Sequence, residues 1–109
     1  MKTFDVSGNL CGSGEYILGS AATGSHACYL VYGVLQPGEQ GRELSPGAGH
    51  EELVLAVQGD IDLQGAFTGT LRQGKAIHLA GEERVTAGNS SAEPSVYVIA
   101  GGHSGTGHH

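Results

Sequence analysis

The chain has 109 residues and a formal net charge of −6, and only 15% of its residues are charged, which together suggest one small domain. Its five Lys and Arg residues are scattered, so no basic surface could follow a nucleic-acid backbone and we expect no nucleic-acid partner. No apolar run approaches the roughly 20 residues of a membrane helix. The first ten residues also lack the apolar core of a signal peptide, so we expect no membrane partner and a cytoplasmic location.

Short apolar segments separated by turn signals fill the first half of the chain. We expect strands at residues 15–20 (EYILGS) and 27–35 (ACYLVYGVL), the second of which is rich in β-formers and long enough to cross a sheet. The letters ATGSH and QPGEQG that follow these two segments are typical of turns. The run ELVLAVQG, residues 52–59, is apolar almost throughout, which suits a barrel wall or a strand covered on both faces.

The second half continues the same pattern. Ile61, Leu63 and Phe67 fall on one face of an alternating segment, and KAIHLAG (75–81) and SVYVIAGG (95–102) are further strands. At least six strands at spacings of roughly 8–12 residues, with 20 glycines and no sustained helical period, predict an all-β sandwich or barrel. We expect one barrel domain over residues 1–102 and a flexible histidine-containing tail over 103–109.

Two stretches of the chain resemble the paired motifs of the cupins, a family with a double-stranded β-helix (jelly-roll) barrel. In the first, LQPGEQG precedes Glu52, six residues and Gly59; in the second, Gly74 opens a strand and Asn89 closes the motif. The resemblance covers roughly residues 27–100. It implies an all-β, double-stranded β-helix fold, a pocket at one mouth of the barrel, and a homodimer.

The metal ligands of the family are mostly replaced. Cupin sites typically take two histidines and the glutamate from the first motif and one histidine from the second. Counted back from Glu52, the two histidine positions of the first motif hold Pro46 and Ala48; counted from the Pro-Gly turn, they hold Leu44 and Pro46. Counted on from Gly74, the histidine position of the second motif holds Val85. Only Glu52 can be carried over, so we expect the usual cupin metal site to be degenerate.

A different metal site can be assembled from the remaining donors. His50 and Glu52 are two residues apart, so on an extended strand they share a face. His78 lies between two small alanines on another strand, which would leave room beside it. His50, Glu52 and His78 are therefore candidate ligands for a divalent transition metal (Zn, Ni, Fe or Mn), with one position left open.

Each of these residues also has an ordinary structural role open to it. His50 follows a glycine and fits a solvated loop. Glu52 fits a rim carboxylate paired with Arg42 or Arg84, and His78 fits a hydrogen-bonded wall residue.

Several aromatic and cysteine side chains are candidates for the pocket or the core. Tyr32, Phe67 and Tyr97 are our candidates for a pocket that binds a small organic ligand, with Tyr29 beside them, although a small barrel also needs such side chains to fill its core. Of the two cysteines, we expect both thiols to be free, with Cys28 packed as a small hydrophobe and Cys11 in a loop. A disulfide between them is the alternative that the sequence leaves open.

Three functions remain open from the sequence. The leading hypothesis is a cupin-like protein that binds a small molecule in the barrel without the usual metal. The second is a metal-dependent enzyme, isomerase or dioxygenase-like, that uses the altered His/Glu site. The third is nickel or zinc handling through the tail histidines His103, His108 and His109.

Overall fold

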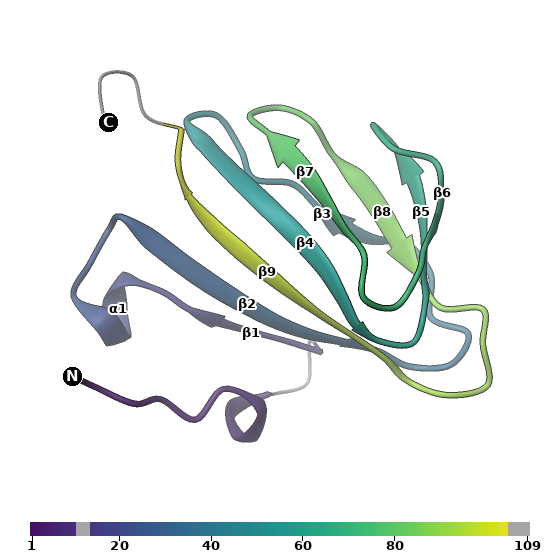
Figure 1. Ribbon diagram of the computed structural model, residues 1–109, viewed down its shortest axis with the longest axis horizontal. Helices are drawn as coiled ribbons and strands as arrows, with labels where there is room; N and C mark the ends of the chain where they lie inside the picture. The colour runs from purple at the N-terminus through teal and green to yellow at the C-terminus, as the bar shows by residue number, and fades with distance from the viewer. Residues whose placement is uncertain (11–13, 105–109) are drawn as a thin grey trace.

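The computed structural model describes residues 1–10 and 14–104, and in it two antiparallel sheets face each other (Figure 1). The first sheet has five strands in the order β1 (Glu15–Leu18), β2 (Cys28–Leu35), β9 (Ser95–His103), β4 (His50–Gln58) and β7 (Ala76–Ala80). The second has four, in the order β3 (Arg42–Leu44), β8 (Val85–Gly88), β5 (Ile61–Gly65) and β6 (Gly69–Leu71). The predicted all-β, double-stranded arrangement is confirmed.

Only two short helical segments accompany these strands in the described part of the chain. They are a 3₁₀ turn, η1 (Ser7–Asn9), and one helical turn, α1 (Ser20–Thr23), which lies between β1 and β2. The described residues contain no helix that is long and apolar enough to cross a bilayer.

The core lies between the two sheets and is built by strict alternation along the strands. On β4, Val54 and Ala56 are buried, and on β9, Tyr97 and Ile99 are buried. Ile61 and Leu63 of β5 meet them from the four-stranded sheet. Because successive side chains of a strand point to opposite faces, the residues between these positions lie on the outside of the barrel.

This alternation decides between two alternatives that the sequence left open for β4, and it corrects the expectation for Phe67. The apolar run of β4 is a barrel wall and is not covered on both faces, since Leu53, Leu55 and Val57 are 51%, 38% and 46% exposed. Phe67 does not share the face of Ile61 and Leu63, because β5 ends at Gly65 and Phe67 lies 40% exposed in the turn before β6.

The end of the last strand and the cysteines also differ from expectation. Strand β9 continues to His103, one residue past the expected domain boundary, while residues 105–109 lie outside the described chain. Cys28 is a free thiol at the start of β2, but it is exposed, so our expectation that it packs as a buried hydrophobe is wrong. Cys11 lies outside the described residues.

Candidate functional site

Near one end of the barrel, the side chain of Tyr29 packs over Gly101 on the neighbouring strand. Tyr29 on β2 lies opposite Gly101 on β9, which in turn lies opposite Glu52 on β4. The Tyr29 hydroxyl donates a hydrogen bond of 2.5 Å to Glu52 Oε2. A Cβ atom at position 101 would lie 2.2 Å from the Tyr29 ring carbon Cζ, so only glycine leaves a path for this side chain.

The same arrangement recurs deeper in the barrel. Tyr97 on β9 crosses Gly33 on β2 and donates a hydrogen bond to Glu15 on β1. Arg42 Nη1 donates to the Tyr97 hydroxyl at 3.2 Å. Burial, followed by the hydrogen bond to Glu15, raises the pKa of the Tyr97 phenol, and Arg42 opposes that rise. Tyr97 is therefore a core residue whose polar end is satisfied inside the fold.

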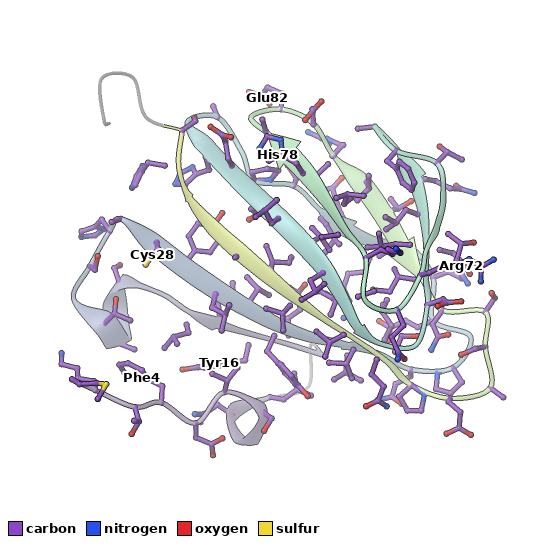
Figure 2. All side chains as sticks on the ribbon, in the orientation of Figure 1. Phe4, Tyr16, Cys28, Arg72, His78 and Glu82 are labelled. Carbon is purple, nitrogen blue, oxygen red and sulfur yellow. The ribbon has the colours of Figure 1, made fainter. Side chains whose placement is uncertain are left out.

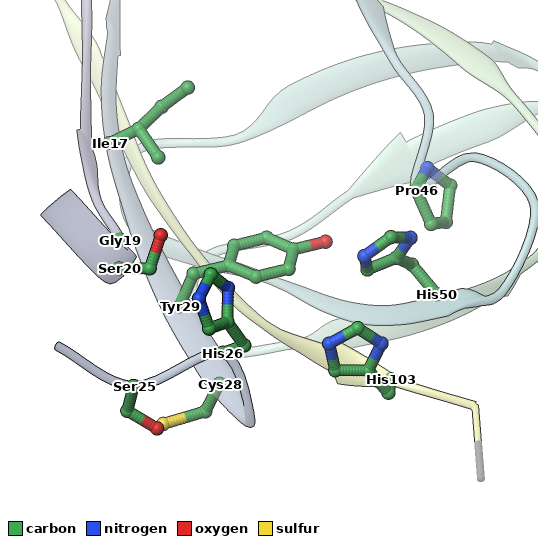
Figure 3. A pocket seen from close by; sticks show the side chains of 10 residues that line it. All are labelled: Ile17, Gly19, Ser20, Ser25, His26, Cys28, Tyr29, Pro46, His50 and His103. Atoms are coloured by element: carbon green, nitrogen blue, oxygen red, sulfur yellow. The ribbon is translucent and has the colours of Figure 1, made fainter.

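A cavity of about 350 Å³ opens at the end of the barrel where β4 begins and β9 ends (Figure 3). We call it the mouth cavity. Its described lining residues are Ile17, Gly19, Ser20, Ser25, His26, Cys28, Tyr29, Pro46, His50 and His103. Three imidazole rings from three parts of the chain thus meet one hollow.

The histidines of the mouth cavity are held mainly by the sheet. His50 and His103 are directly opposite each other on β4 and β9, and their ring centroids are 4.9 Å apart with the planes tilted by 33°. The Tyr29 ring meets the His50 ring edge-on at 6.1 Å. His26 comes from the turn between α1 and β2.

A smaller inner cavity of about 150 Å³ lies on the other side of Tyr29. Tyr29 and Ile17 line both cavities, and the inner one also has three carboxylate residues, Glu15, Glu43 and Glu52, in its lining. Burial is the largest cause that raises the pKa of the Tyr29 phenol, and the hydrogen bond to Glu52 adds to it. The Tyr29 hydroxyl is therefore a proton donor held in place at neutral pH, between a histidine-lined hollow and a carboxylate-lined one.

The three candidate metal ligands do not come together. His50 lines the mouth cavity, and Glu52 is 7% exposed inside the barrel. His78 lies outside, where its Nε2 atom is 2.8 Å from Glu51 Oε1. The register explains this result, because His78 pairs with Leu53, whose side chain points outward, and Glu52 pairs with Leu79. Within residues 1–10 and 14–104, no group of three or more His, Cys, Asp or Glu side chains is placed to hold a metal ion.

Glu52 has a different partner from the two that the sequence suggested. Arg42 pairs with Glu39 at 2.5 Å and Arg84 pairs with Glu43 at 3.3 Å. Glu52 instead accepts a hydrogen bond from the Tyr29 hydroxyl, and its carboxylate lies in the interior of the barrel.

The three aromatic candidates for the ligand pocket are also spread apart. Tyr32 lies on the outer face of the five-stranded sheet, beside Tyr16, Phe67 lies in the exposed turn, and Tyr97 is fully buried. Tyr29 is the tyrosine that reaches the mouth cavity. Sequence reasoning also missed His26 and His103 as cavity residues, since finding His103 requires the register between β4 and β9.

A second hollow of about 260 Å³ lies at the opposite end of the barrel, beyond the end of β4. It is lined by Asp60, Asp62, Thr70, Arg72, Asn89, Ser90 and Ser91. Figure 2 shows Arg72 far from His78 and Glu82, which mark the end where β4 begins. We call this hollow the far cavity. Its described lining contains neither histidine nor aromatic residues.

Comparison with known proteins identifies the fold. No protein-family model and no curated protein sequence matches the chain. Among solved structures, a Cupin 2 conserved barrel domain protein from Salinispora arenicola superposes with a TM-score of 0.76 at 16% identity, over 95% of this chain and 90% of that one. A predicted oxalate decarboxylase from Thermotoga maritima gives a TM-score of 0.67 at 13% identity, over 82% and 80%.

A sugar phosphate isomerase of the cupin superfamily from Silicibacter pomeroyi gives a TM-score of 0.64 at 17% identity, over 94% of this chain and 68% of that one. The chain therefore has the double-stranded β-helix fold of the cupins, as the motifs around Glu52 and Gly74 led us to expect. Superpositions at identities this low establish the fold, whereas function has to be argued from the site itself.

Proposed function

We propose that the chain binds a small oxygen-rich organic molecule in the mouth cavity, without the usual cupin metal site. The observation that carries this proposal is the convergence of three histidines and two serines on one hollow of about 350 Å³ at the end of the barrel. That volume is within the range of small-molecule sites.

The lining of the mouth cavity favours hydroxyl or carboxylate oxygens. Imidazole N–H groups and the Ser20 and Ser25 hydroxyls can donate hydrogen bonds to such oxygens. None of the described lining residues is Asp, Glu, Lys or Arg, so the recognition we propose depends on hydrogen bonds more than on an ion pair. Ile17 and Pro46 add apolar contacts for the carbon skeleton of the ligand.

The structural neighbours are compatible with this ligand class. One is named for a sugar phosphate and another for oxalate, and both compounds are small and rich in oxygen. The second hypothesis, a metal-dependent enzyme built on His50, Glu52 and His78, lacks this support because His78 lies on the outer face.

Nuclear magnetic resonance of the ¹⁵N-labelled full chain tests the proposal. A panel of small sugars, sugar phosphates and short carboxylic acids is added in the presence of EDTA, so that no metal contributes. We expect shifts that cluster on Gly19, Ser25, Gly101 and His103. Shifts confined to the far cavity, or no saturable shift with any compound, would contradict the proposal.

We also propose that two copies of the chain associate through the outer face of the five-stranded sheet. The register places apolar residues side by side across this face, in the rows Leu18–Leu30–Ala100–Leu53 and Tyr16–Tyr32–Val98–Leu55. Leu53, Leu55 and Val57 of β4 are exposed apolar side chains on it. Covering a contiguous apolar face of this kind is energetically favourable. A second copy of the chain can cover it by two-fold symmetry.

A further inference from the structure

We infer that His50 and His103 form a binding site for one divalent late transition-metal ion, Cu²⁺, Ni²⁺ or Zn²⁺, at the edge of the mouth cavity. This goes beyond the proposed function, which requires no metal. It also differs from the usual cupin site, because neither histidine occupies a position of the cupin ligand motif and Glu52 takes no part.

The sheet brings the two side chains close together. Ser104 N–H donates to Gly49 O at 2.9 Å, so residues 49 and 104 are hydrogen-bonded partners directly beyond the end of the β4–β9 ladder. The adjacent pair, His50 and His103, is then a non-hydrogen-bonded pair, in which facing side chains approach most closely. The backbone of both strands therefore fixes the position of these histidines before any ligand arrives.

The spacing of the rings suits a chelate. Two imidazoles that bind one ion through nitrogens at about 2.0–2.1 Å have centroids roughly 4.5 Å apart at right-angled positions and roughly 5.2 Å apart at tetrahedral positions. The observed separation of the His50 and His103 centroids is 4.9 Å. Rotation about the side-chain torsions is thus enough to aim one nitrogen of each ring at a common point.

The hydrogen bond of His50 Nδ1 leaves Nε2 available to bind a metal ion. His50 Nδ1 lies 3.2 Å from the carbonyl oxygen of Ala48, and a carbonyl can only accept, so Nδ1 carries the proton. In the neutral ring Nε2 then holds the lone pair. Histidines that bind metals usually donate their other ring N–H in this way, which fixes both tautomer and orientation.

The mouth cavity offers room for the remaining ligands of the ion. Imidazole selects copper, nickel and zinc over magnesium or calcium, which prefer oxygen ligands. The mouth cavity leaves room for water or a small oxygen ligand on the ion, and His26 lines the same cavity from a turn (Figure 3). Among the described residues, no third side chain already stands with the pair at ligand distance, so we expect weaker binding than at a site with three protein ligands.

Calorimetric titration with ZnCl₂ alone tests this site in the full chain. All variants carry His108→Ala and His109→Ala, so that the end of the chain cannot supply the ligands. In this background we expect one Zn²⁺ per chain, and a loss of about tenfold or more in affinity when either His50→Ala or His103→Ala removes one of the two ligands. His78→Ala, on the outer face, is the matched control and should leave the affinity unchanged.

Two further measurements keep the result interpretable. Circular dichroism establishes that each variant folds, and His50→Gln and His103→Gln, which retain a polar side chain, should show the same loss. Absence of Zn²⁺ binding in the background chain, unchanged affinity in the pair variants, or an equal loss in His78→Ala would each overturn the inference. Since the small-molecule experiment contains EDTA, failure here does not affect the proposed function.

Discussion

Gly101 is the residue on which the arrangement of the mouth cavity depends. We expect Gly101→Ala to force the Tyr29 ring away from Glu52, because the new Cβ would lie 2.2 Å from the ring. Overpacking and the loss of a partly buried hydrogen bond together predict about 1–3 kcal/mol of destabilisation in urea unfolding. Gly19→Ala is the matched control, since its Cβ would meet nothing closer than 3.8 Å. Equal effects of the two substitutions would contradict this role for Gly101.

Tyr29 gives a second prediction at the same scale, from the pH dependence of stability. The pKa of its phenol is raised above the ordinary value of 10.0, first by burial and then by Glu52. A raised folded-state pKa contributes stability that is complete below the unfolded pKa and is lost as pH rises above about 10. We expect Tyr29→Phe to reduce this alkaline loss, measured by thermal unfolding between pH 8 and 11. An identical slope in wild type and variant would contradict the prediction.

At the scale of single strands, the sequence predicted the longer extended segments but neither the short strands β3 and β8 nor the register of any strand. Alternation along β7 leaves two faces open to His78, and the sequence alone favours the inner one; the pairing with β4 selects the outer one. His103 was assigned to a tail because glycines surround it, although β9 extends through it. Strands β3 and β8 are only 3 and 4 residues long, so they show no clear alternation of apolar and polar residues from which to predict them.

Strand β7 allows a direct test of this register. His78 is an exposed residue paired with Glu51, so we expect His78→Ala to change the free energy of unfolding by less than about 1 kcal/mol. Its neighbour Leu79 is 2% exposed, so Leu79→Ala should cost roughly 2–5 kcal/mol. Urea denaturation of the two variants measures both, and the reverse order would mean that β7 faces the other way.

For the whole molecule, the residues that match the cupin motifs predicted the fold because they stabilise turns between its strands. Gly59 and Gly74 have φ angles of 74° and 86°, a region that favours glycine. The buried Asn89 amide donates to Leu35 O and Glu93 O, joining the ends of distant segments. The cavity lining could not be predicted in the same way, because it depends on pairings between strands that are far apart in sequence.

The proposed dimer is tested at this same scale by analytical ultracentrifugation. We expect the wild-type chain to sediment as a dimer and Leu55→Glu to sediment as a monomer, because a charge on the outer face of the five-stranded sheet opposes its burial. Gln64→Glu, an exposed position on the four-stranded sheet, adds the same charge elsewhere and should remain dimeric. A monomeric wild-type chain would contradict the proposal.

The placement of His50 beside His103, with His78 on the opposite side of the sheet, is the central claim about this molecule. Nuclear Overhauser effects in the labelled full chain measure it most directly. We predict a strong cross-strand contact between the Hα protons of His50 and His103, ring contacts from Tyr29 to His50, and contacts from the His78 ring to Glu51. Contacts from the His78 ring to Tyr29 or Glu52, with none between His50 and His103, would contradict it.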